Sequence, residues 1–280
     1  MRIFGRRTKE RLILSVLVLL TGVAIVPLFW IVGSIIWNGF SAISLEFLTS
    51  LPAPFGSSGG GIGNAILGTL LINCSASIFG IPVGILTGIY LSEYSSKGRL
   101  GSLVRIVVES LSGVPSIVIG LFAFTLIVMT VRHYTGIAAT LALGLMMIPL
   151  VAKATEESMR VVSNDLREAA IALGIPKYNV AIRVVLSMAK SGVISGSLLA
   201  FARISGETAP LLFTSLFSFY WPTGIDQPIA TLQVLIYNYA ISGFADWVSK
   251  AWGASLLLVL IVLVINLVVR VLGKQKYVGV

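Results

Sequence analysis

Two charged residues, Arg203 and Glu207, lie four positions apart inside a long apolar run, 191–217. An arginine at the centre of a membrane helix costs on the order of 2.5–3.5 kcal/mol, so its side chain must face protein or water. Arg203 follows Ser191 by twelve residues, which is about 18 Å of helix and places it near the middle of a bilayer core of roughly 30 Å. A continuous helix would put Glu207 on the same face, where it partly neutralises the arginine. The pair is therefore either a buried structural ion pair or a fixed charge on the route of an ion.

The chemistry that the second alternative predicts is recognition of an oxyanion. A guanidinium stays charged at any relevant pH, and its planar fork of donors fits a tetrahedral oxyanion. A transport site must also release its ion, and Glu207 would weaken binding enough to allow this. Ser205 and Thr208 add hydroxyl groups, and Pro210 is expected to break the helix one turn later. We assign Arg203, Glu207 and Thr208 as candidate substrate-pathway residues.

A second constellation occupies the charged connection between two apolar runs and reads EAAIALGIPKYNVAIRVVL at 168–186. Asp165 is predicted to cap a short helix there, with Glu168 closing a capping box. Gly174 stands where a left-handed residue ends a helix, and Pro176 prevents its continuation. The alanines between them make the exposed face thin enough to enter a groove on a partner, although an ordinary loop helix agrees equally well with the capping.

The composition is that of an integral membrane protein. Of 280 residues 56% are hydrophobic and 11% charged, against roughly 25% charged in soluble domains, and the mean hydropathy is +0.98. We expect an all-α, polytopic membrane protein in which 1–280 form a single domain with six transmembrane helices in the lipid bilayer. The six apolar runs are Leu12–Trp37, Asn64–Ser92, Ser110–Val131, Thr135–Ala152, Ser191–Phe217 and Ala251–Val269.

The lysines and arginines predict the orientation of these helices. Seventeen of the 20 lie before the first run, after the last, or in the second-to-third and fourth-to-fifth connections. Both termini are therefore predicted to be cytoplasmic, with a cytoplasmic loop at about 153–190 and outer loops at about 38–63 and 218–250. The glycines of GSSGGGIGN, at 56–64, predict a mobile turn, and Thr231–Phe244 predicts a re-entrant or interfacial helix. Topology explains the net charge of +9, so no nucleic-acid partner is needed.

The spacing within 168–186 resembles the EAA loop of bacterial ABC importer permeases. Glu168, Ala169 and Ala170 are followed by Gly174 after three residues and by a triplet ending at Leu186 after nine more. A valine and a serine stand where the family usually has isoleucine and proline. In that family the loop is the coupling helix that inserts into the ATP-hydrolysing subunit. The resemblance therefore implies an ATPase-coupling role for these five residues.

The segment ARISGETAPLLFTSLF, at 202–217, resembles the A-type permease of phosphate-specific ABC importers, which carries R-x-x-G-E-T-A-P-L-L. The segments 60–72, 111–122 and 227–240 resemble the same subfamily. The resemblance implies the type I importer permease fold in a prokaryotic cell (inner) membrane, with Arg203 and Glu207 taking part in phosphate translocation. It implies as partners a second homologous permease, two ATP-binding subunits and an extracellular or periplasmic phosphate-binding protein.

The segment 111–122 combines Pro115 with several small residues. Small residues at this density let helices approach closely, and that close packing is one prediction for the segment. A proline inside a span also frees a backbone carbonyl and bends the axis, so a break lining a pathway is the other.

Several classes of chemistry have no basis in the sequence. No G-x-x-x-x-G-K-[ST] motif is present, so the chain is expected to be no enzyme, with ATP hydrolysis supplied by partner subunits. Cys74 and His133 stand alone, which predicts no disulfide, metal site or cofactor. The alternatives are an importer permease for another oxyanion or solute and an ion-coupled anion carrier, although a carrier often has inverted repeats that are not seen here.

Overall fold

The computed structural model describes residues 6–54, 57, 59–95 and 98–273, and over these ranges the chain is helical, as predicted, with one isolated β-bridge between Pro52 and Gly60. The N-terminal half contains α1 (Arg6–Gly39), a 3-10 turn (Phe40–Ala42), α2 (Leu45–Thr49), α3 (Gly63–Glu93), α4 (Arg99–Gly113), α5 (Ser116–Ala123), a π-helical turn (Phe124–Val128) and α6 (Met129–Val131). The C-terminal half contains α7 (Gly136–Arg160), α8 (Asn164–Ala172), α9 (Lys177–Asn179), a π-helical turn (Val180–Val185), α10 (Leu186–Ile204), α11 (Ala209–Thr214), α12 (Leu232–Ala240) and α13 (Ala245–Gly273).

Five described helices are long and apolar enough to cross a membrane: α1, α3, α7, the continuous helix Lys177–Ile204, and α13. A sixth span exists if α4 and the helix Ser116–Val131 count as one element, although they meet at 104°. The expected run Ser110–Val131 is thus not one straight helix. Pro115 lacks an amide hydrogen and disfavours helical backbone angles at the residue before it. Val114 accordingly has an extended backbone (φ −70°, ψ 130°), and the chain turns there.

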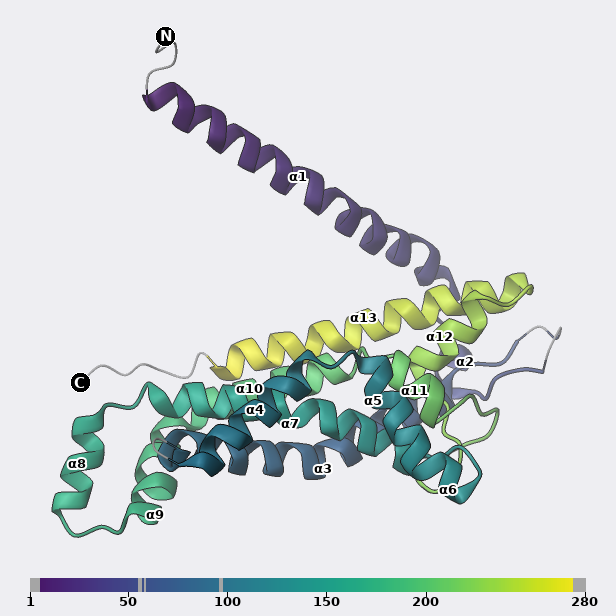
Figure 1. Ribbon diagram of the computed structural model, residues 1–280. Helices are drawn as coiled ribbons and strands as arrows, with labels where there is room; N and C mark the ends of the chain where they lie inside the picture. Colours follow the sequence, from purple (N-terminus) through teal and green to yellow (C-terminus); the bar gives the residue numbers. More distant parts are fainter. Residues whose placement is uncertain (1–5, 55–56, 58, 96–97, 274–280) are drawn as a thin grey trace.

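The spans form a bundle from which the first helix diverges (Figure 1). The helices α3, α7 and α10 run side by side, and α13 lies along them. In contrast, α1 is exposed over most of its length and meets α13 only near its end, where Gly39 lies against the carbonyl group of Trp252. The start of α1 and the end of α13 both lie on the side of the bundle that carries α8 and α9.

Three glycines let α3 lie directly against α7. Gly80, Gly84 and Gly88 recur every four residues and therefore share one helix face. A Cβ atom at Gly84 would lie 2.6 Å from the Cβ of Val151, and one at Gly88 would lie 2.5 Å from the Cβ of Thr155. Small residues at this spacing bring membrane helices into backbone contact. The two helices therefore form a tightly joined pair.

Replacing Gly84 with alanine is expected to destabilise this pair. The added methyl group overpacks the contact with Val151, at a cost of about 1–3 kcal/mol. Thermal unfolding in detergent should shift downward by several degrees. Gly22→Ala is the matched control, because Gly22 has open space around it on α1. Equal unfolding temperatures for the two variants would contradict the packing argument.

The part of the predicted mobile turn that is packed, contrary to the prediction, is the one around Gly60 and Gly61, whereas residues 56 and 58 lie outside the described residues. Gly60 adopts a left-handed φ of 75° opposite Pro52. A Cβ atom at Gly61 would lie 2.4 Å from the carbonyl oxygen of Phe47. These glycines therefore allow close backbone approach beside α2.

The predicted short helix in 218–250 is α12, and its nine residues are too few to cross a bilayer. Thr231 caps its start, and the side chains of Leu232, Gln233 and Tyr239 are buried. Contacts with α3, α11 and α13 hold α12 inside the bundle. Whether α12 is re-entrant or interfacial stays a prediction.

His133 joins the turn after α6 to the loop before α12. Its Nδ1 lies 3.0 Å from the carbonyl oxygen of Val131, and its Nε2 lies 2.9 Å from that of Asp226. Carbonyl oxygens only accept hydrogen bonds, so both contacts are satisfied when the ring carries two protons. The carbonyl groups of Val131 and Asp226 raise the pKa of His133 above 6.5.

This contact predicts a pH-dependent loop. Because the pKa is raised on folding, the stabilisation is fully present below pH 6.5 and is lost as pH rises through the raised value. Hydrogen exchange of the amides at 223–227 and 229, corrected for intrinsic rates, should be faster at about pH 8.5 than at about pH 6. His133→Gln should remove the difference, and a persisting difference in that variant would exclude His133 as its cause.

Candidate functional site

The charged motif at 203–208 lies at a break between two helices. The helix α10 ends at Ile204 and α11 begins at Ala209. The amide groups of Gly206 and Glu207 close the turn by donating to the carbonyl groups of Arg203 and Ile204, each over 3.1 Å. The prediction that Pro210 breaks a continuous helix is therefore wrong: Pro210 lies in the first turn of α11, where its missing amide hydrogen needs no partner.

Arg203 and Glu207 nevertheless reach the same hollow. Its other walls come from the end of α4, the first turns of α5 and the middle of α7; the lining residues are Leu111, Ser112, Val114, Ile119, Met146, Pro149, Leu150, Arg203, Ile204 and Glu207. Among the described residues, neither charged side chain has a hydrogen-bond partner, and the two are not within the 4.0 Å of an ion pair. The contact that the structural-pair alternative requires is therefore not formed.

Buried amide side chains hold the break in place. The side chain of Asn73 on α3 donates to the hydroxyl of Ser205 over 3.0 Å. The side chain of Gln233 on α12 donates to the carbonyl group of Ser205. All three residues are almost completely buried. Sequence reasoning missed Asn73 and Gln233, and the available signal was an amide residue inside an otherwise apolar stretch.

The same contacts give the depth of the site. Asn73 lies ten residues from the start of α3 and twenty from its end, or about 15 Å and 30 Å along the helix. Ser205 lies at that level, and Arg203 is exposed on the surface of this chain. A charged side chain at such depth does not face lipid. Water or another protein must cover this surface in the membrane.

The segment 111–122 packs closely in one part and lines the hollow in another, and its role in a pathway stays a prediction. Its first part, including Ser112 and Val114, lines the hollow opposite Arg203. Its second part packs closely, since a Cβ atom at Gly120 would lie 2.5 Å from the Cα of Pro210. Thr208 is half-buried, precedes α11 and is not among the residues lining the hollow, so its pathway role stays a prediction.

The helix α8 contains the EAA sequence, with different capping from that predicted. Ser163 occupies the N-cap position, and its side chain forms no capping hydrogen bond. Asp165 lies in the first turn of the helix. The capping box between Asp165 and Glu168 is therefore wrong. The predicted end of the helix is confirmed: Gly174 has φ +80°, its amide donates to Ile171, and the amide of Ile175 donates to Ala170.

The five candidate coupling residues divide into two groups. Glu168, Ala169 and Gly174 are exposed. Ala170 is buried, and Leu186 is half-buried at the start of α10; both pack in one apolar cluster between α8 and α10. Leu186 therefore packs on the buried side of α8 and is not part of its exposed surface. Much of the predicted connection 153–190 is itself helical, since α7 continues to Arg160 and a continuous helix begins at Lys177.

The exposed side of α8 and the following turn carries large apolar side chains. Leu173 is 82% exposed and Ile171 is 51% exposed. Tyr178, four residues after Gly174, is exposed as well. Such a surface on a charged connection is suited to contact with another protein.

Comparison with known proteins agrees with this geometry. Residues 80–275 match the family described as "Binding-protein-dependent transport system inner membrane component". A phosphate transport system permease protein PstA of Yersinia pestis is 42% identical over 97% of this chain and 92% of its own length. The PstA of Haemophilus influenzae is 39% identical over 99% of this chain and 98% of its own length. A probable PstA of Methanocaldococcus jannaschii is 35% identical over 95% and 94%.

Solved structures share the fold at low sequence identity. A bacterial alginate ABC transporter in complex with alginate pentasaccharide-bound periplasmic protein has a chain with a TM-score of 0.70 and 16% identity, and the match covers 100% of both chains. A chain of the MetNI methionine ABC transporter, in an inward-facing conformation, has a TM-score of 0.63 and 18% sequence identity. That match covers 75% of this chain and 95% of the transporter chain. The resemblance drawn from the sequence is confirmed, and the chain belongs to the binding-protein-dependent transport system inner membrane component family.

Proposed function

We propose that this chain is the permease subunit of an ATP-driven importer that carries inorganic phosphate across the cell membrane. The observation that carries the proposal is that Arg203 and Glu207, which have no ion-pair partner among the described residues, line one hollow at a helix break midway along the bundle. Arg203 offers the donor fork that a phosphate oxyanion fits. Glu207 keeps the empty site near neutral, so that the bound anion can leave. The relatives named phosphate transport permeases support this choice of substrate.

The partners follow from what this chain leaves uncovered. The exposed surface around Arg203 is covered by a second, homologous permease, and the pathway runs between the two. Two ATP-binding subunits dock on Glu168, Ala169 and Gly174 of the α8 surface, and ATP supplies the energy there. A phosphate-binding protein delivers the ion at the opposite face, where α2 and the loop before α12 lie. Both termini and α8 are then cytoplasmic, in agreement with the distribution of lysine and arginine.

Transport follows as a movement of helices and involves no chemical change in the ion. ATP binding draws the two ATP-binding subunits together, and the grip on α8 moves the spans that it is attached to. The hollow beside Arg203 then opens to one side of the membrane and afterwards to the other. Because Arg203 and Glu207 lie at a break supported from α3 and α12, movement of α3 reaches them through Asn73.

The test is uptake of labelled phosphate and labelled sulfate by vesicles containing this chain with its partner subunits. ATP-dependent uptake of phosphate, with sulfate excluded, is the expected result. ATP-dependent uptake of sulfate alone would keep the importer and refute the substrate. Uptake that needs no ATP would refute coupling through α8 and favour an ion-coupled carrier.

A further inference from the structure

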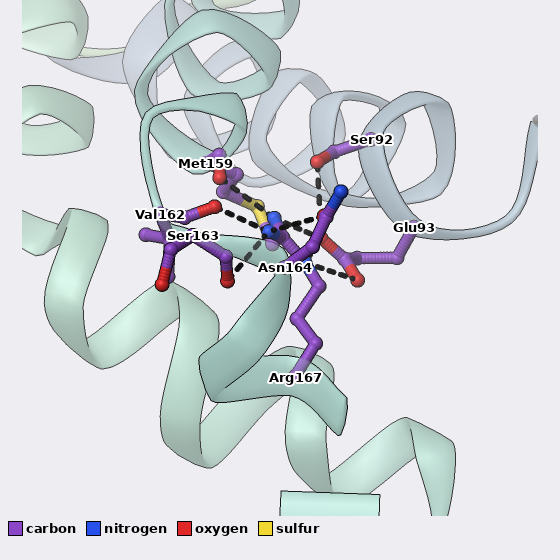
Figure 2. A network of polar contacts seen from close by, with 7 residues as sticks. All are labelled: Ser92, Glu93, Met159, Val162, Ser163, Asn164 and Arg167. Carbon is purple, nitrogen blue, oxygen red and sulfur yellow. Dashed lines mark hydrogen bonds and ion pairs between the residues drawn. The ribbon is translucent and has the colours of Figure 1, made fainter. Parts of the chain in front are cut away.

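One arginine fastens α8 to the helix bundle (Figure 2). Arg167 lies beside Glu168, yet it points inward to Glu93, the last residue of α3. Its Nη2 lies 3.0 Å from Oε1 of Glu93, and its Nε lies 3.2 Å from the same oxygen. The hydroxyl of Ser92 donates to that oxygen as well, over 3.1 Å. The carboxylate therefore receives donors from two helices.

The same guanidinium also binds the end of α7. Nη2 donates to the carbonyl group of Met159 over 2.8 Å, and Nη1 donates to those of Val162 and Ser163. Carbonyl groups in the last turn of a helix have no partner within it, and a cation satisfies them well. Arg167 thus joins three segments: α8, the end of α3 and the end of α7.

Burial makes this junction more than a surface ion pair. The side chain of Arg167 is 17% exposed and that of Glu93 is 6% exposed. A partly buried, hydrogen-bonded arginine–carboxylate pair is screened far less than an exposed pair. Removing one partner leaves the other charge buried without compensation. A separate group of ion pairs joins α4 and α7, in which Glu156 binds Arg105 and Arg160, each over 2.7 Å.

We propose that Arg167 and Glu93 form the junction through which movement of α8 is passed to α3 and α7. This proposal rests on the importer function proposed above and names the positioning residues for its coupling step. The glycine contacts join α3 to α7, so a pull on one moves the other. Further along α3, Asn73 holds Ser205 beside Arg203. The single helix α3 therefore connects the coupling helix to the charged break.

The experiment uses the assembled transporter in vesicles and measures ATP hydrolysis and phosphate uptake side by side. Arg167→Met and Glu93→Gln should retain assembly and hydrolysis, while phosphate carried per ATP falls by about 5–150-fold, the usual range of an allosteric coupling. The double variant should be no worse than either single variant, since both remove one junction. Arg167→Lys should recover only part of the phosphate carried per ATP, because an ammonium group lacks the planar fork of donors that binds the carboxylate and the carbonyl groups together.

Controls separate this proposal from the general function. Arg99→Met is the matched control, since Arg99 is exposed on α4 on the same side and its side chain has no ion pair or hydrogen bond among the described residues. A parallel loss of hydrolysis, uptake and assembled complex in the Arg167 and Glu93 variants would overturn the junction and leave a merely structural role. Unchanged phosphate carried per ATP would overturn it as well. Absence of ATP-driven uptake in the unmodified protein would refute the proposed function instead.

Discussion

Phosphate uptake should fall by about 30-fold or more when Arg203 is replaced by glutamine, because losing one partner of a desolvated charge contact costs about 2–5 kcal/mol. Glutamine keeps much of the length and can still donate a hydrogen bond, but it removes the fixed charge and the fork of donors. The assembled complex should stay in the membrane, since Arg203 forms no ion pair or hydrogen bond with another described residue. Uptake of labelled phosphate and the amount of purified complex measure the two effects separately.

Two further substitutions sharpen this result. Arg203→Lys keeps the charge and should lose less than Arg203→Gln, because an ammonium binds an oxyanion as a point charge. Glu207→Gln should bind phosphate more tightly and release it more slowly, since a repelling carboxylate is gone. Loss of the complex in Arg203→Gln would instead assign Arg203 a structural role. Full uptake in that variant would remove Arg203 from the pathway.

Local rules predicted the parts of the site that depend on one residue and its neighbours. Gly174 was identifiable because only a few residue types accept a left-handed backbone, and the observed φ is +80°. Arg203 and Glu207 were identifiable because charges inside an apolar run are expensive. The long spans α1, α3, α7 and α13 were identifiable from apolar length alone.

Other features depend on contacts between distant segments. Ser163 and Asp165 are both good N-cap residues, and the choice between them depends on where α7 ends and on how Arg167 binds the carbonyl groups there. Glu93 reads in sequence as the polar border of a span, and its partner is 74 positions away. Amino-acid composition does not predict which two charged residues that lie far apart in the sequence will form an ion pair.

The break in the fifth span illustrates the same limit. Pro210 suggested a kink within one helix, but the helix ends earlier, at Ile204. Ser205 can leave the helix because Asn73 and Gln233 supply hydrogen bonds to its hydroxyl and carbonyl groups. In a membrane an unpaired backbone group costs several kcal/mol, so an irregular turn requires such partners. The charged site therefore depends on residues from two other elements.

Replacing Gly174 with valine should uncouple ATP hydrolysis from uptake. No other atom lies within 4 Å of the position that a Cβ would take, so crowding cannot cause an effect. The cost is conformational, because a left-handed backbone at a residue with a Cβ costs about 1–2 kcal/mol and a β-branched residue fits it poorly. The turn is expected to relax by changing the angle between α8 and the helix that begins at Lys177. Uptake per ATP should therefore fall by about tenfold, the equivalent of 1.4 kcal/mol.

Two control variants separate this strain from a change in side-chain chemistry. Gly174→Asn should keep most of the uptake, since asparagine tolerates the left-handed region. Gly98→Val should have little effect, because Gly98 is also exposed and uncrowded but has an extended backbone (φ −112°, ψ 146°) that valine adopts readily. Parallel measurements of hydrolysis and uptake compare the three variants. If Gly174→Val keeps normal uptake per ATP, the geometry of this turn does not carry the coupling, and the exposed side chains of α8 must carry it alone.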